Sequence, residues 1–213
     1  GEAIWQAKQK CPDLVCLPPH YDLYEKISLK LHELYLDYTD FVEPLGLDEC
    51  WLDVTNSLNY LQKTGKEIAD EIRERVKEEF NITVSVGVSF SKIFAKLGSD
   101  MKKPDATTVI SKENFKQMTY NLPLNSIIGI GNRLERRFEN MNVVTIGDFV
   151  NLSQDIIRPI MGKTGIELQE KLSGRLIEEV PCYFNLSPPK SIGNGTTTVI
   201  DITKRSEVVK VVA

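Results

Sequence analysis

The run from Val42 to Thr55 carries two adjacent carboxylates, Asp48 and Glu49, between two short apolar segments. Apolar residues on both sides of a Leu-Gly-Leu turn predict two short strands joined in a tight hairpin. Two neighbouring acids at its tip repel each other and resist dehydration unless a cation lies between them. Mg²⁺ takes one or two carboxylates together with substrate phosphates, so the pair is a candidate metal site. A solvated hairpin tip is the alternative interpretation.

The spacing of apolar residues elsewhere predicts helices that alternate with short strands. Helices are expected over residues 2–10, 22–38, 57–80 and 91–103, with an extended piece at residues 13–18 between the first two. Besides the hairpin, strands are expected at residues 82–88 and 107–110. This order indicates an α+β fold, with helices on one face of a small antiparallel sheet. Short helices broken by glycines then predict a separate all-α unit over residues 114–176. Residues 185–190 have linker composition, and residues 191–213 begin a β-rich segment.

The composition is that of an ordinary globular protein, since 41% of the 213 residues are hydrophobic and 26% are charged. No apolar run approaches the ~20 residues of a membrane span, and no secretory signal pattern is visible. We therefore expect a cytoplasmic protein with no membrane partner. The four cysteines lack the paired spacing of a zinc site and are expected to be free, mostly buried thiols.

The net charge of −4 argues by itself against a general nucleic-acid binder. The charge is uneven, however. Residues 1–81 hold 9 basic and 17 acidic side chains, and residues 82–213 hold the other 17 basic and 13 acidic ones. The basic surplus falls in the part that carries the phosphate-binding signals described below. A mixed solvated surface explains the surplus equally well.

The helix expected from Ser91 to Lys103 carries lysines on one side. Lys92 and Lys96 lie four residues apart, and Lys103 lies at the helix end just before Pro104. Ammonium groups beside a metal-binding carboxylate pair suit a triphosphate, because the metal neutralises one side and the lysines the other. A solvated helix face is the alternative.

A Gly-x-Gly turn opens a basic helix further along the chain. Gly129, Ile130 and Gly131 precede Arg133 and two further arginines, so free backbone N–H groups and a positive helix end are expected there. Such an arrangement holds a DNA phosphate without reading the sequence. A structural turn explains the glycines alone, but a second helix after residue 145 favours a helix-hairpin-helix.

Taken in order, these segments resemble the Y-family (translesion) DNA polymerases, most closely the bacterial DNA polymerase IV branch. The matching runs are residues 42–45 with Asp48-Glu49 and 52–55, residues 85–89, residues 92–97 with 99–104, residues 129–131, and residues 190–193. Their order and spacing cover essentially the whole chain. The chain departs from the family at Gly46, where serine is favoured, and at Cys50, where alanine is usual.

The resemblance implies part of a polymerase palm followed by an all-α thumb with a helix-hairpin-helix. Residues 1–20 would be a remnant of the fingers and residues 21–113 the palm. Residues 114–184 would be the thumb, and residues 185–213 a linker and the start of the little-finger domain.

The resemblance also implies roles for individual residues. Asp48 and Glu49 match two of three carboxylates that bind Mg²⁺ (or Mn²⁺), and Glu49 is also tied to activation of the primer 3′-hydroxyl. Lys103 matches a lysine that contacts the incoming deoxynucleoside triphosphate. Gly129 and Gly131 match a thumb hairpin that grips the backbone of primer–template DNA. The implied chemistry is two-metal phosphoryl transfer.

The family's third metal-binding aspartate, on a strand in the middle of the palm sheet, has no match in this chain. We therefore expect weak metal affinity and little or no polymerase activity from these residues alone. The open sheet is expected either to close up or to take a strand from another chain, giving a strand-exchanged homodimer. The rival functions are a non-catalytic, sequence-independent DNA-binding module and, more remotely, a nucleotide cyclase.

Overall fold

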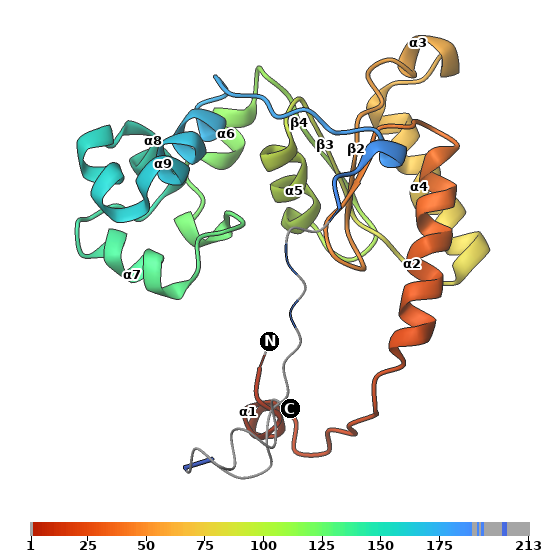
Figure 1. Cartoon of the computed structure of the whole chain (residues 1–213), viewed down its shortest axis with the longest axis horizontal. Coiled ribbons are helices and arrows are strands. Elements are labelled where there is room, and N and C mark those ends of the chain that lie inside the picture. Colours follow the sequence, from red (N-terminus) through yellow and green to blue (C-terminus); the bar gives the residue numbers. More distant parts are fainter. Residues whose placement is uncertain (1, 189–190, 192, 194–201, 204–213) are drawn as a thin grey trace.

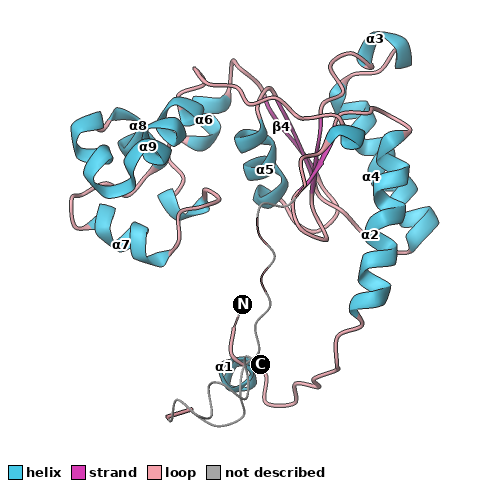
Figure 2. Cartoon of the chain, in the orientation of Figure 1, coloured by secondary structure: helices cyan, strands magenta, loops and turns pink. Residues whose placement is uncertain are grey.

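A computed structural model gives the fold and describes residues 2–188, 191, 193, 202 and 203. Helices lie against two small β-sheets in the first part of the chain, and a group of short helices follows (Figures 1 and 2). In the described residues, no helix has the length and apolar character needed to cross a membrane. The β-rich segment expected over residues 191–213 lies outside the described residues, apart from four single positions.

Two long amphipathic helices, α2 (Tyr21–Leu36) and α4 (Gly65–Phe80), pack against each other. Their facing apolar side chains, with Tyr38 just beyond the end of α2, form one core cluster. Its members are Leu31, Leu34, Tyr38, Ile68, Ile72 and Val76. Burying this apolar stripe is what stabilises both helices, because an isolated helix of this length is marginal in water.

The single helix expected over residues 57–80 is wrong. A short helix α3 (Leu58–Leu61) ends at Gln62, whose φ of 51° is left-handed, and α4 begins afresh after Thr64. The Thr64 hydroxyl accepts a hydrogen bond from the Glu67 amide, and the Glu67 carboxylate accepts one from the Thr64 amide. This capping box sets a helix start that apolar periodicity does not show. The expected stop at Asn81 is confirmed by its left-handed φ of 55°.

The predicted hairpin is confirmed. Strand β1 (Val42–Pro44) pairs antiparallel with β2 (Cys50–Leu52), and Val42 lies opposite Leu52. The Leu45 amide donates to the Glu49 carbonyl at 2.7 Å and closes the turn.

The second sheet contradicts the expected antiparallel arrangement. Strand β3 (Val86–Ser89) pairs in parallel with β4 (Thr107–Ile110), and α5 (Lys92–Met101) connects them. A helix between two strands carries the chain back to the starting edge, so the second strand runs in the same direction as the first. Strand β3 begins later than expected because its pairing starts where the Val86 amide donates to Ala106. Helix α5 ends before Lys103.

Gly87 is required for α5 to lie close to β3. A Cβ atom at this position would lie 1.8 Å from the Ala95 carbonyl oxygen, which no side chain can tolerate. Ser91 holds the expected N-cap position of α5, but its side chain makes no capping hydrogen bond. The buried Ser91 hydroxyl has no hydrogen-bond partner within the described residues.

The two sheets do not join. Among the described residues β2 pairs only with β1, and β3 pairs only with β4. Closure of the sheet, one of the two expected outcomes, is therefore wrong for this structure.

The helical part follows β4 and shares a core with α5. It contains α6 (Phe115–Thr119), α7 (Asn132–Glu139), α8 (Ile146–Asn151) and α9 (Gln154–Leu172, interrupted by a non-helical Gly162), with 3₁₀ turns at Leu124–Ser126 and Tyr183–Asn185. Phe94 of α5 belongs to the same buried cluster as Phe138 and Phe149. The packing is therefore continuous across the proposed palm–thumb boundary, whose position stays a prediction.

The first helix, α1 (Ile4–Lys10), lies away from the other described helices and strands, and residues 11–20 lead from it to α2 (Figure 1). All four cysteines are free, as expected. The expectation that they are mostly buried is wrong for Cys11 and Cys16, which are exposed.

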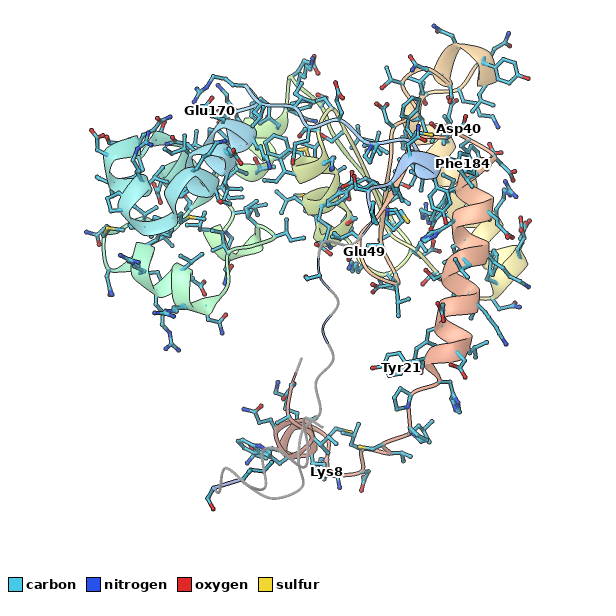
Figure 3. The ribbon with its side chains drawn as sticks, in the orientation of Figure 1. Lys8, Tyr21, Asp40, Glu49, Glu170 and Phe184 are labelled. Atoms are coloured by element: carbon cyan, nitrogen blue, oxygen red, sulfur yellow. The ribbon has the colours of Figure 1, made fainter. Side chains whose placement is uncertain are left out.

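Two further contacts tie distant parts of the chain together. The Tyr183 amide donates to the Asp40 carbonyl at 2.8 Å, so the chain after α9 returns to the end of α2 (Figure 3). Asp105, before β4, accepts hydrogen bonds from Lys77 and Arg73 of α4 at 2.9 and 2.7 Å. These two cations, Lys77 foremost, lower the pKa of the Asp105 carboxyl.

Candidate active site

The carboxylate pair lies at the tip of the β1–β2 hairpin. Gly46 has a φ of 78°, which glycine adopts without strain, and lets the chain reverse between the strands. Asp48 is exposed and Glu49 is half-buried. The tip therefore presents an exposed carboxylate at Asp48 and a half-buried one at Glu49, which is labelled in Figure 3.

The lysine row of α5 faces this hairpin, as the spacing predicted. Lys96 Nζ donates to Glu49 Oε1 at 2.8 Å and to Asp100 Oδ2 at 2.7 Å. Lys103 Nζ lies 2.8 Å from the other Asp100 oxygen. Charges therefore alternate from the hairpin tip to the end of α5.

These contacts shift the ionisation of the two central groups. Burial by itself would lower the pKa of Lys96, but the hydrogen bonds with Asp100 and Glu49 outweigh it and the pKa is raised. Burial would raise the pKa of Asp100, but the hydrogen bonds with Lys103 and Lys96 outweigh it and the pKa is lowered. Lys96 is thus held as a cation beside the carboxylate pair.

A groove of about 440 Å³, which we call the β2–β3 groove, joins these residues. It is lined by Tyr35, Leu45, residues 48–52, Val54, Gly65, Ile68, Ala69, Ile72, residues 83–89, Ala95, Lys96, Ser99 and residues 103–105. Asp48, Glu49 and Lys103 all line it. The structure therefore brings the predicted carboxylates and the predicted triphosphate lysine to one site, with Lys96 between them.

The residues at the hairpin tip suit a hard divalent cation. Two neighbouring carboxylates supply oxygen donors, which Mg²⁺ and Mn²⁺ prefer, and the groove leaves room for other oxygen ligands. Among residues 2–188 no group of three or more acidic, histidine or cysteine side chains is placed to hold a metal ion.

Sequence reasoning missed three contacts beside the site. Lys92 forms an ion pair with Glu43 of β1 and lies 4.7 Å from the centre of the Trp51 ring. The Trp51 indole also donates to the Lys92 carbonyl at 3.1 Å. These contacts fix α5 against the hairpin. The partners are more than 40 residues apart in the sequence, so no local pattern shows these contacts. The only signal was the position of Lys92, four residues before Lys96.

The second predicted site is the turn before α7. Gly129 has a φ of 92°, Ile130 is buried, and Gly131 is the N-cap of α7 without a side-chain cap. A Cβ atom at either glycine would meet nothing within 4 Å, so the turn is open on that side. Arg133 follows in the first turn of α7, and α8 begins seven residues after α7 ends. None of residues 129–133 lines the β2–β3 groove, so the turn and the groove are separate sites.

Comparison with known proteins gives a consistent result. Residues 1–100 match the impB/mucB/samB family. DNA polymerase IV of Acetivibrio thermocellus is 45% identical over 208 residues, which are 98% of this chain and 52% of that protein. DNA polymerase IV 1 of Bacillus subtilis is 31% identical over 98% of this chain and 50% of that protein.

Solved structures agree with these relatives. DinB from Sulfolobus solfataricus superposes with a TM-score of 0.75 at 29% identity, over 84% of this chain and 53% of that one. An insertion ternary complex of Dbh DNA polymerase gives a TM-score of 0.76 at 30% identity, over 84% of this chain and 53% of that one. The chain is a relative of the Y-family DNA polymerases. It spans about half the length of the curated relatives it matches.

Proposed function

We propose that this chain forms part of a translesion DNA polymerase and that the β2–β3 groove is its nucleotidyl-transfer site. One observation carries the proposal: Asp48, Glu49 and Lys103, which resemble the family's metal and triphosphate residues, line the same groove. The relatives are named DNA polymerase IV and DNA polymerase IV 1, and this chain matches about half of their length.

In this proposal Asp48 and Glu49 hold Mg²⁺ or Mn²⁺. When bound, the two ions of such a site activate the attacking primer hydroxyl and stabilise the leaving pyrophosphate. Lys103, whose side chain is 56% exposed, is able to leave Asp100 and contact a triphosphate. Lys96 competes with the metal for Glu49, so metal loading exchanges one ion pair for another. This competition gives a physical reason for weak metal affinity.

The proposed DNA contact lies on the helical part, at the turn formed by Gly129, Ile130 and Gly131 and at Arg133. The open backbone of the turn and the positive end of α7 suit a phosphate group. We accordingly propose residues 21–113 as palm, residues 114–184 as thumb with a helix-hairpin-helix, and residues 1–20 as a remnant of the fingers. The proposed partners are primer–template DNA and a deoxynucleoside triphosphate.

Nucleotide binding tests the groove directly. In the presence of Mn²⁺, a fluorescent non-hydrolysable deoxynucleoside triphosphate is expected to bind weakly, and both Asp48→Ala and Lys103→Met should reduce that binding several-fold. Lys163→Met is the matched control, because Lys163 lies on α9 and its side chain is 89% exposed. Binding that is independent of metal, or equal in all four proteins, would overturn the assignment.

Primer extension tests the activity of these 213 residues. We expect little or no extension, because the described residues hold no group of three or more acidic, histidine or cysteine side chains placed to hold a metal ion. Extension that disappears in Asp48→Ala would contradict this expectation and would show that two carboxylates suffice.

A non-catalytic DNA-binding module is the second candidate, and the open turn before α7 favours it. It predicts sequence-indifferent DNA binding that weakens as salt is raised. Gly131→Asp should reduce that binding, because aspartate caps a helix well but repels phosphate. Gly131→Asn is the matched control without the charge. Under this candidate Asp48→Ala leaves binding unchanged and no metal-dependent nucleotide binding is found.

A further inference from the structure

Lys103 lies in the loop that joins α5 to β4. Helix α5 ends at Met101, and β4 begins at Thr107. In the part of the chain that the structure describes, residues 103–105 make no backbone–backbone hydrogen bond. The Lys103 side chain is 56% exposed and pairs with Asp100, which is 40% exposed. The position of the Lys103 backbone therefore depends on side-chain contacts to this loop.

Arg73 of α4 supplies such contacts through Asp105. Its Nη2 atom donates to the Asp105 carbonyl and to Asp105 Oδ1, both at 2.7 Å, and its Nε atom donates to Oδ1 at 3.1 Å. Lys77 donates to the other carboxylate oxygen at 2.9 Å. One guanidinium thus binds both the side chain and the main chain of the residue two positions after Lys103, which suits the planar fork of arginine.

The backbone of Asp105 needs this support. Its φ of 52° is left-handed, which is uncommon for a residue other than glycine. Such a conformation costs free energy and persists only where the surrounding contacts impose it. Without Arg73 only Lys77 would pair with the Asp105 side chain, and the Asp105 carbonyl would lose its donor. The loop backbone is then expected to relax and to carry Lys103 with it.

Arg73 itself is held in place from two sides. Its side chain is 15% exposed, and Nη1 lies 3.3 Å from Asp70 Oδ1 and 3.4 Å from Thr107 Oγ1. Thr107 also donates to Asp70 at 2.6 Å. The preceding residue on α4, Ile72, is buried in the core and lines the β2–β3 groove, whereas Arg73 does not line it. Arg73 therefore ties the loop to a helix of the groove without entering the site.

We propose that Arg73 is a positioning residue for Lys103: it holds Asp105 to α4 and so fixes the loop from which Lys103 reaches a bound triphosphate. The inference deepens the proposed function and rests on its assignment of Lys103 to triphosphate binding.

Charge masking is the alternative role for Arg73. Asp105 lines the groove, and its carboxylate would repel a triphosphate more strongly if the guanidinium did not neutralise it. The two roles differ in one respect. Positioning acts through the Lys103 ammonium, whereas masking acts whether or not that ammonium is present.

A double-mutant cycle separates the two roles, because two substitutions that act through the same contact do not add. The measured quantity is the Mn²⁺-dependent affinity of the chain for a fluorescent non-hydrolysable deoxynucleoside triphosphate. Arg73→Met should lower this affinity several-fold, but no more than Lys103→Met does, and should lower it little further in the Lys103→Met background. Arg73→Lys keeps the charge without the fork, so it should show the same pattern to a smaller extent. It decides the test if Arg73→Met does not fold.

Arg75→Met is the matched control. Arg75 lies on the same helix, pairs with Asp37 and Glu79, and does not line the groove. Both methionine variants lose ion pairs and should lower the free energy of unfolding, which chemical denaturation measures. Only Arg73→Met should weaken nucleotide binding, and a role in stability alone would not produce that difference.

The outcomes separate this inference from the function on which it rests. Unchanged affinity in both Arg73 variants, with a loss in Lys103→Met, would overturn the positioning role and leave the proposed function standing. So would an equal loss in Arg75→Met, or an equally large loss in the Lys103→Met background, which would indicate charge masking. If the unsubstituted chain binds no nucleotide with metal, or if Lys103→Met leaves binding unchanged, the proposed function fails and this inference fails with it.

Discussion

Lys96 is the group whose removal tests the proposed metal site most directly. Its ammonium lies 2.8 Å from Glu49 Oε1, and a bound Mn²⁺ would lie about 2.1 Å from a carboxylate oxygen. The two cations are then ~5 Å apart. At that distance a divalent ion and an ammonium repel by ~1–2 kcal/mol in a water-like dielectric, where two unit charges interact by about 332/(εr).

Lys96→Met removes this repulsion and frees Glu49 Oε1 from its ion pair. The Mn²⁺ affinity should therefore rise about 5- to 30-fold, since 1.4 kcal/mol corresponds to about tenfold. The side chains of Lys96 and Glu49 are 16% and 34% exposed, so salt screens the effect only in part.

Calorimetric titration with Mn²⁺ measures this change, and Lys163→Met is the control that removes the same charge from α9. An affinity that is unchanged or weaker in Lys96→Met would refute the reasoning, because Lys96 would then not compete for Glu49. Equal gains in both variants would show a general charge effect instead.

The remaining predictions concern stability, measured by chemical denaturation. Gly87→Ala should cost more than ~3 kcal/mol or prevent folding, because its Cβ meets backbone, whereas Gly131→Ala should change stability by less than ~1 kcal/mol. Ser91→Ala should be neutral or stabilising, because its buried hydroxyl is unpaired, whereas Thr64→Ala should cost ~1 kcal/mol by losing a cap. Because ion pairs lower the pKa of Asp105, its contribution is present above the unfolded pKa of ~3.9 and is lost as pH falls through the lower folded value. In Asp105→Asn the free energy of unfolding should therefore fall less steeply as the pH is lowered below about 4.

The sequence predicted the parts of the structure that local patterns determine. The β1–β2 hairpin followed from apolar runs around a Gly turn, and the β4 strand was found with its bounds because both features are short and local. The side of α5 that faces the hairpin followed from the four-residue spacing of Lys92 and Lys96. These inferences needed no information about distant contacts.

Helix starts, strand pairing and contacts between distant residues were harder to predict from the sequence patterns. The start of α4 was signalled by Thr64 and Glu67, but apolar periodicity ran through it. The parallel pairing of β3 and β4 was implied by the helix between them. The Trp51–Lys92 contact had no local signal, since it depends on how α5 and the hairpin pack.

Helix α5 contacts two neighbours with opposite faces. Its lysines hold the hairpin tip, and Phe94 on the other face is fully buried among the helices that follow β4. A rigid helix clamped on both faces transmits displacement, because close-packed interiors compress little. We therefore expect a displacement of the helical part to shift the ammonium of Lys96 relative to Glu49. A rearrangement of that ion pair is expected in turn to disturb the aromatic packing around Phe94.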